Sequence, residues 1–522
     1  MFDVIITGGR IFDGTGKPAF TGDVAITGDT ITEIAPGLAK AETRRLIHAE
    51  GRMVCPGFID THSHSDVYVL VQPDAPSKIF QGVTTEVVGN CGASGAPLRG
   101  AYRMPSDWKD KPFPDTWQSV ADYRRLLEAH PPAVNIVLLV GHNTLRGGAM
   151  GYDNRPATPE ELRDMVAQLE QGMDEGARGL SSGLMYPPGM FAPAEEVATL
   201  CKVAARRDGT YTTHMRNEGS GLLEAIDEAI SAARQSGVRL QISHLKTAGK
   251  ANWHKIDAAL ERIEAARAAG MDITADRYPY IASYTDLDYI LPSWFMEGGN
   301  KASLARLRDP ATRKKLREEL CHDHPNAYWP TVVVGAVTEH FHRKYQGMPL
   351  VDVAKQLNME PVDACLYLLD VDELRTNAFF LGMSEANMHR ILAMPWVMLG
   401  SDASVRALTG PLSVDYPHPR AYGTFPRFLR MALDGKTVPV EEAVRKMTSL
   451  PAQQFRLKDR GTLARGKKAD LSIINPETVH DTATFNQPRR LAEGVELVMV
   501  NGRVALENRQ MSGSYAGKML AG

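Results

Sequence analysis

The middle of the chain, roughly residues 57–455, carries eight apolar runs with the length of buried strands, and amphipathic helical stretches separate them. Two of these stretches are residues 158–176 and 220–237. Continuous apolar strands that alternate with helices are typical of a buried parallel sheet, and eight of them predict an α/β fold, a (β/α)8 TIM-like barrel. The runs are FIDTHSH (58–64), TTEVVGNC (84–91), VNIVLLVGH (134–142), GLSSGL (179–184), TYTTHM (210–215), RLQISHL (239–245), MDITADRYPY (271–280) and WVMLGSDA (396–403).

Both ends of the chain differ from this middle. Residues 1–56 and 456–522 consist of short segments in which apolar and polar residues alternate, broken by Gly, Asp and Pro, a pattern typical of strands and tight turns. The pair Asn501-Gly502 between two such segments is typical of a type I′ hairpin turn. Two β-rich ends around a different middle predict one small β-sandwich domain built from both termini.

One interval interrupts the alternation of apolar runs and helical stretches. Residues 281–396, between the seventh and eighth runs, are far more than a crossover helix needs. They include a charged helix around 311–320 and a strand at 331–337. We expect an insertion over the barrel mouth, a candidate lid or specificity element. Its large side chains form either an apolar cap over the substrate or the core of the insertion itself: Tyr284, Tyr289, Trp294, Phe295 and Met296.

Composition excludes several classes of partner. The 522 residues include 59 Lys and Arg and 62 Asp and Glu, a net charge of −3, so we expect neither nucleic acid nor an anionic membrane as a partner. No stretch approaches the roughly 18 apolar residues that span a bilayer, and residues 1–14 lack the features of a signal peptide. Five dispersed cysteines do not form a disulfide framework. We expect a cytoplasmic protein, and the sequence leaves its oligomeric state open.

Six candidate metal ligands each follow an apolar run at its C-terminal end. Active sites of (β/α)8 barrels lie at that end of the strands. Imidazole, thiolate and carboxylate together suit zinc or a similar borderline divalent metal. Because the six are scattered over some 340 residues, only a large fold can bring them together, and the pattern predicts a metal-dependent enzyme. They are His62, His64, Cys91, His214, His244 and Asp402.

The first two ligands lie at positions i and i+2 of a strand, so their side chains project to one face. That spacing alone is weak evidence, and the strand entry at 56–60 is what favours a metal role. Two other pairs with the same spacing stand in charged settings that indicate solvent exposure: His322 and His324, and His340 and His342.

The remaining ligands have plainer alternatives. Cys91 on its own would be an inert buried thiol, but it ends the second run directly before Gly92, which favours a ligand. His142 also ends a run, and we expect it to pack behind the site. Asp402 could cap the helix that follows it; together with the histidines it is the natural general base, because a carboxylate beside a metal-activated water can move that water's proton.

Longer motifs carry a family resemblance over essentially the whole chain. The motif PGFIDTHSHSD, the strand-end histidines, the terminal GSDA and the split β-domain resemble the amidohydrolase superfamily of metal-dependent hydrolases. Further motifs are similar to the N-acyl-D-amino-acid deacylases, or D-aminoacylases, within it. They are NCG (90–92), GLSSGLMYPPGMFA (179–192), THMRNEG (213–219), SHLK (243–246) and HPRAYGTFPR (418–427).

The resemblance implies how the metal is held. In that subgroup a cysteine takes the place of the carboxylated lysine that bridges two metals in other relatives, and Cys91 matches it. A tight zinc would then lie among Cys91, His214 and His244. A second, weaker position would lie among His62, His64 and Asp402. The sequence does not decide between one metal and two.

The resemblance also implies a substrate, a small N-acylated amino acid. Lys246, Tyr278 and Arg420 would hold its α-carboxylate, and Tyr186 would donate to the oxyanion, unless it is only a packed aromatic. Lys246 has independent support, since it lies two residues beyond His244 and shares that face of the strand.

The implied reaction is zinc-dependent hydrolysis of the amide, with Asp402 as general base and then acid, which releases a carboxylate and a D-amino acid. The D configuration rests wholly on the resemblance. Residues 281–287 and 403–417 depart from the family pattern where the side chain or acyl group should pack, so substrate preference is not carried over. A dipeptidase or cyclic-amide hydrolase is the alternative within the superfamily, and a non-catalytic assembly protein is a remote one.

Overall fold

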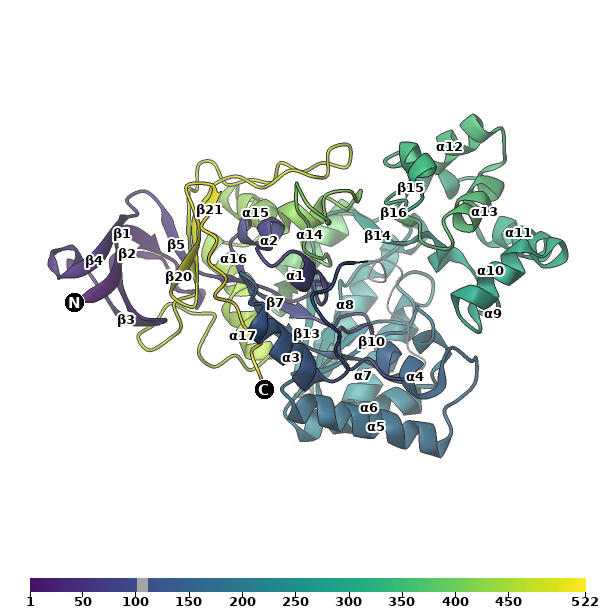
Figure 1. The fold of residues 1–522 in the computed structure, drawn as a ribbon, viewed down its shortest axis with the longest axis horizontal. Coiled ribbons are helices and arrows are strands. Elements are labelled where there is room, and N and C mark those ends of the chain that lie inside the picture. Colours follow the sequence, from purple (N-terminus) through teal and green to yellow (C-terminus); the bar gives the residue numbers. More distant parts are fainter. Residues whose placement is uncertain (101–110) are drawn as a thin grey trace.

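The structure is a computed structural model that describes residues 1–100 and 111–522 (Figure 1). The eight predicted runs form parallel strands in the order in which they occur along the chain. The third run contributes two short strands, because the ladder is interrupted at residue 139. The strands are β6 (Phe58–Asp60), β7 (Val83–Val88), β8 (Asn135–Leu138) with β9 (Val140–Gly141), β10 (Gly179–Gly183), β11 (Thr210–His214), β12 (Arg239–Ile242), β13 (Ile273–Arg277) and β17 (Val397–Leu399).

The barrel closes where the segment after β17 meets the segment after β6. Ser63 and Ala403 form a parallel bridge, and the backbone N–H of Asp402 donates to the carbonyl of His62 at 2.8 Å. These contacts join the last strand to the first, which confirms the predicted (β/α)8 barrel.

Helices cover the outside of the barrel, and local sequence sets their ends. In α5, Thr158 and Glu161 form a reciprocal capping box with proline at the first helical position, and α7 ends at Gly237 with φ of 73°. The helices are α1 (Tyr68–Val71), α2 (Pro76–Ile79), α3 (Val120–Ala129), α4 (His142–Met150), α5 (Pro159–Asp174), α6 (Ala194–Arg206), α7 (Leu222–Ser236), α8 (Ile256–Ala268), α14 (Glu385–Ala393), α15 (Arg420–Leu433), α16 (Val440–Met447) and α17 (Ser449–Gln454).

Strands from both ends of the chain form one nine-stranded sheet, at the left of Figure 1. The two ends join where β5 pairs antiparallel with β18, and they share one apolar core. Asn501 and Gly502, with φ of 47° and 75°, form the expected tight turn between β19 and β20. The strands are β1 (Phe2–Ile11), β2 (Phe20–Thr27), β3 (Thr30–Ala35), β4 (Thr43–His48), β5 (Met53–Pro56), β18 (Leu471–Ile474), β19 (Val495–Val500), β20 (Arg503–Glu507) and β21 (Gln510–Met511).

The insertion between β13 and β17 forms a separate lobe at the other end of the molecule (Figure 1), with a three-stranded sheet and its own apolar core. The expected strand and charged helix are β15 and α11. The range 281–396 also contains α14, which packs on β13 and β17 and is therefore the barrel's own crossover helix. The elements of the lobe are β14 (Ala282–Asp286), β15 (Val332–Val334), β16 (Asn377–Leu381), α9 (Ser293–Met296), α10 (Asn300–Arg308), α11 (Pro310–Asp323), α12 (Leu350–Leu357) and α13 (Pro361–Val371). In the described part of the chain, no helix combines the length and apolar character that a membrane crossing requires.

A buried lysine on α2 ties the barrel closure together. The Nζ of Lys78 donates to Asp60 Oδ2 at 2.8 Å, to Ser401 Oγ at 2.9 Å and to the carbonyl of Ala403 at 2.8 Å, and lies 3.0 Å from Glu86 Oε1. The lysine and both carboxylates are fully buried. One cation thus holds the first strand, the second strand and the segment after the last strand.

Replacing this lysine should destabilise the protein strongly. Lys78→Met leaves the carboxylates of Asp60 and Glu86 buried without a counter-ion, so we expect the free energy of unfolding to fall by about 3–5 kcal/mol. Lys355→Met is the matched control, since Lys355 forms an exposed ion pair with Asp352 and should contribute less than about 1 kcal/mol. Denaturant titration measures both, and equal losses in the two variants would contradict the closing role of Lys78.

Candidate metal centre and active site

A cavity of about 1310 Å³ opens at the C-terminal ends of the barrel strands, and both the barrel and the insertion line it. The structure brings all of the predicted site residues to this region. Of these residues, only His62 does not line the cavity, and it is fully buried. The others line the cavity: His64, Cys91, Tyr186, His214, His244, Lys246, Tyr278, Asp402 and Arg420.

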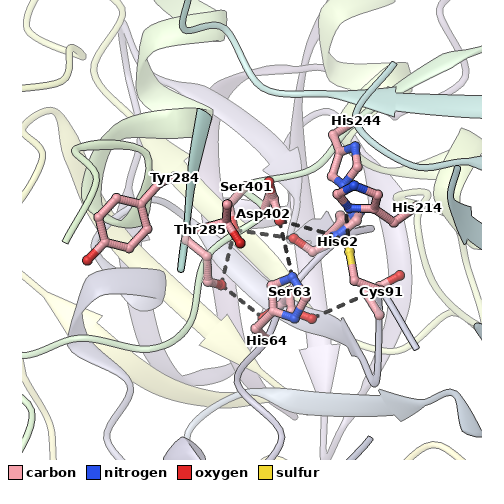
Figure 2. Close-up of polar contacts among 12 residues, drawn as sticks. His62, Ser63, His64, Cys91, His214, His244, Tyr284, Thr285, Ser401 and Asp402 are labelled. Carbon is pink, nitrogen blue, oxygen red and sulfur yellow. Dashed lines mark hydrogen bonds and ion pairs between the residues drawn. The ribbon is translucent and has the colours of Figure 1, made fainter. Parts of the chain in front are cut away.

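The six candidate ligands form two overlapping groups that share Cys91, and in Figure 2 their side chains converge on one region. Within each group the ligand atoms lie within 4.8 Å of one another. The Cys91 Sγ lies 3.3 Å from His62 Nε2 and 3.6 Å from His244 Nε2. The first group consists of His62, His64, Cys91 and Asp402, and the second of Cys91, His214 and His244.

Three of the ligands occupy the left-handed region of backbone conformation. Cys91, His244 and Asp402 have φ of 51°, 36° and 51°, and each follows the end of its strand within three residues. Such a conformation costs a residue other than glycine about 1–3 kcal/mol, and it persists only where the surrounding structure imposes it. It turns each side chain out of the strand alternation and toward the barrel mouth.

Asp276, a residue that the sequence reasoning missed, supports the first group. Its Oδ1 lies 3.2 Å from His62 Nδ1 and accepts from the backbone N–H of His244 at 2.9 Å, and its Oδ2 accepts from Gln241 Nε2 at 2.6 Å. A carboxylate at Nδ1 fixes the imidazole so that Nε2 would face a metal held by this group. The sequence contained a sign of this role, because Asp276 lies near the C-terminal end of the seventh strand, and the candidate ligands lie near the ends of their own strands.

Glu218 plays the same part in the second group. Its Oε1 lies 2.9 Å from His244 Nδ1 and also forms an ion pair with Lys246. Glu218 follows His214 by four residues in THMRNEG, and nothing in that spacing points across the barrel to His244. The sequence therefore gave only a weak signal for this residue.

The donor set fits a zinc ion. The Nδ1 of His214 is buried and has no hydrogen-bond partner among the described residues, as expected of a nitrogen that can ligate a metal. Burial raises the pKa of the Cys91 thiol, but the charge of His62 and hydrogen bonds from the neighbouring histidines outweigh it and hold that pKa well below its usual value. Thiolate, imidazole and carboxylate ligands in this combination are typical of zinc.

Asp402 is held as a carboxylate beside the ligands. Its Oδ1 lies 3.1 Å from His64 Nε2, and its Oδ2 lies 2.8 Å from Arg420 Nη1. Burial raises the pKa of Asp402, but the positive charges of Arg420 and of the site histidines outweigh it and keep the pKa well below its usual range. Asp402 is therefore ionised in the resting site.

The other predicted residues surround this centre. The hydroxyl of Tyr186 lies 3.1 Å from Thr285 Oγ1 on the insertion. The Nζ of Lys246 lies 2.8 Å from His244 Nδ1 and forms an ion pair with Glu218. The hydroxyl of Tyr278 is buried with no hydrogen-bond partner among the described residues, although the ring lines the cavity.

Several histidines lie outside the centre. His142 begins α4 and pairs with Glu196 through Nε2 at 2.8 Å, without lining the cavity. The two pairs that were expected to be exposed lie on the insertion. His322 and His340 are exposed, but His324 and His342 are half-buried, which corrects that expectation. None of the four joins a metal-ligand group in the described part of the chain.

Some large side chains of the insertion form its own core, and others line the cavity. Phe295 is buried in the core of the insertion and Trp294 packs against that core. Tyr284 and Tyr289 line the cavity, and Met296 contributes to both. The insertion therefore presents part of an aromatic wall to the site.

Comparisons with known proteins agree with this site. The sequence model of the Amidohydrolase family matches residues 45–317 and 359–506. D-aminoacylase of Alcaligenes xylosoxydans xylosoxydans is 36% identical over 100% of this chain and 98% of its own length. N-acyl-D-glutamate deacylase of the same organism is 35% identical over 96% of this chain and 93% of its own length.

A solved structure extends the likeness to the fold. The crystal structure of N-acyl-D-glutamate deacylase from Bordetella bronchiseptica, complexed with zinc and a phosphonate inhibitor, has 32% identity and a TM-score of 0.86 over 100% of both chains. The family match covers most of the chain, and the two relatives share more than a third of their residues with it. On this evidence the chain belongs to the amidohydrolase family.

Proposed function

We propose that this protein is a zinc-dependent deacylase that hydrolyses the amide bond of small N-acyl-D-amino acids to a carboxylate and a free D-amino acid. The observation that carries the proposal is the pair of ligand groups sharing Cys91, next to three basic or hydroxyl side chains suited to a carboxylate. The names of the full-length relatives, D-aminoacylase and N-acyl-D-glutamate deacylase, support the substrate class and the D configuration. The free cysteines among the described residues fit a reducing compartment such as the cytoplasm.

Cys91, His214 and His244 would hold the tight zinc, because the buried unpartnered nitrogen belongs to this group. His62, His64 and Asp402, with the shared Cys91, would form a second and weaker position. A bound zinc supplies electrophilic polarisation of the scissile carbonyl and lowers the pKa of water from 15.7 toward about 7.

Side chains of the protein carry the proton transfers. Asp402 accepts the proton of the attacking water and later gives it to the amine that leaves. Tyr186 donates a hydrogen bond to the oxyanion that develops on the former carbonyl, since the residue lines the cavity and its hydroxyl has Thr285 as its one partner among the described residues.

Three residues would hold the α-carboxylate of the substrate. Arg420 offers a planar guanidinium suited to a bidentate pair, Tyr278 offers a hydroxyl without a hydrogen-bond partner among the described residues, and Lys246 adds a positive charge. This clamp favours the deacylase over a cyclic-amide hydrolase, because a cyclic amide has no free carboxylate to bind. A dipeptidase keeps that carboxylate, so substrate assays must separate the two.

A non-catalytic role is the least supported alternative. Relatives that lose catalysis commonly lose ligands, whereas all six candidates stand together here with the supporting carboxylates Asp276 and Glu218 in place.

Paired substrates test the proposal directly. With zinc-loaded enzyme, we expect amine release from N-acetyl-D-amino acids and none from their L enantiomers, measured for the Met, Leu, Phe and Glu compounds. Activity confined to L compounds, dipeptides or hydantoins would overturn the assignment while leaving a metal-dependent hydrolase.

The role of Asp402 predicts a loss of turnover. Asp402→Asn should lower kcat by roughly 10²–10⁴-fold, because an amide cannot accept the proton of the attacking water. Turnover is measured per bound zinc, so that weaker metal binding is not mistaken for lost catalysis. Asp481→Asn, which changes a carboxylate paired with Arg427 outside the cavity, is the control. Near-wild-type turnover in Asp402→Asn would rule out the general base.

Metal binding distinguishes the shared ligand from structural thiols. Cys91→Ala should weaken zinc binding by more than the 10–100-fold expected for Glu218→Gln, since Glu218 only orients His244. Cys201→Ala, which removes a buried thiol that belongs to neither ligand group, should bind zinc like the parent protein. Chelator competition measures all three affinities, and a Cys91→Ala protein that matches Cys201→Ala would contradict the ligand assignment.

A further inference from the structure

Arg277, the last residue of β13, carries a buried positive charge that the proposed mechanism does not use. The residue is 1% exposed and is among the largest fully buried side chains of the described residues. Its Nη2 donates to the carbonyl of Tyr280 at 2.8 Å and to Met383 Sδ at 3.0 Å, whereas Nε and Nη1 have no hydrogen-bond partner among the described residues. No carboxylate of the described chain forms an ion pair with it.

The guanidinium of Arg277 stacks on Tyr278. Its central carbon lies 4.3 Å from the centre of the Tyr278 ring, and that of Arg420 lies 4.6 Å from the same ring. Tyr278 and Arg420 line the cavity, but Arg277 does not. The tyrosine is therefore held by two cations, one of which lies behind the cavity wall.

The charges around the site differ in how they are balanced. Lys246 is paired with Glu218, and Arg420 is paired with Asp402. Arg277 has no such partner among the described residues. Burying a charge without a counter-ion lowers the stability of a protein by several kcal/mol. A protein that retains such a charge is therefore expected to bind an anion next to it when it functions.

We propose that Arg277 is a positioning residue for the carboxylate end of the substrate. It fixes the ring of Tyr278 from behind, so that the unpartnered hydroxyl stays directed at the substrate. It also supplies the positive charge that the incoming carboxylate balances. The inference rests on the proposed function and deepens it: the enzyme selects substrates with a free carboxylate, and rejects the corresponding amides, partly through a residue that never touches them.

Two substitutions separate charge from packing. Arg277→Gln keeps a donor for the carbonyl of Tyr280 but removes the charge, and should raise KM for an N-acetyl-D-amino acid by roughly tenfold, with kcat little changed. KM for the matching N-acetyl-D-amino acid amide should stay the same. Arg277→Lys restores the charge and should recover most of the loss, which a purely structural role would not produce.

Arg427→Gln is the matched control. Arg427 also stacks on a tyrosine of the same motif, 4.7 Å from the ring of Tyr280, but it is paired with Asp481 and does not line the cavity. It should change neither KM. Thermal unfolding of each variant verifies that it is folded.

The outcomes separate this inference from the proposed function. Parent enzyme that does not hydrolyse the acid substrate contradicts the proposed function itself. Active parent enzyme, with Arg277→Gln equally impaired on acid and amide or unimpaired on both, overturns the role of Arg277. If Arg277→Gln does not fold, an Arg277→Lys protein that folds yet loses discrimination between acid and amide overturns it as well.

Discussion

The closure of the barrel by one buried lysine is the interaction on which the rest of the structure depends. Lys78 binds the carboxylate of Asp60 on the first strand and the carbonyl of Ala403 after the last, next to Asp402. The candidate metal centre spans this same seam, because two of its histidines follow β6 and its carboxylate follows β17. The distances among those ligands are therefore set by how firmly the seam is closed.

Around the candidate metal centre, buried side chains of opposite charge are paired with one another. The chain places Asp276 behind His62, Glu218 between His244 and Lys246, and Arg420 against Asp402, so most cations meet a carboxylate before any substrate arrives. Such pairs hold the ligands in one orientation and leave little reorganisation for the reaction. Arg277 departs from this scheme, and a substrate carboxylate would complete it.

Sequence reasoning reached those features that depend on periodicity or on strand ends. Alternation of apolar runs and helices sufficed for the barrel, and the position of a residue such as His214 at a strand end sufficed to nominate it as a ligand. Glu218 was missed because its partners, His244 and Lys246, follow another strand, and Arg277 because the absence of a counter-ion around it among the described residues is visible only in the folded barrel. The left-handed backbone of Cys91 was equally hidden, since the surrounding contacts impose it against the residue's own preference. Phe295 and Tyr284 took different roles because burial within the insertion is decided by its packing.

The pairing of β5 with β18 has a consequence for the protein while it is being synthesised. One edge of β5 forms its backbone hydrogen bonds with β18, and the residues of the whole barrel lie between the two strands in the sequence. At about 5–20 residues per second, on the order of 20 to 80 seconds pass between the synthesis of one strand and that of the other. During that interval the ribosome carries a nascent chain whose apolar β5 has an open edge, and such an edge can pair with other chains.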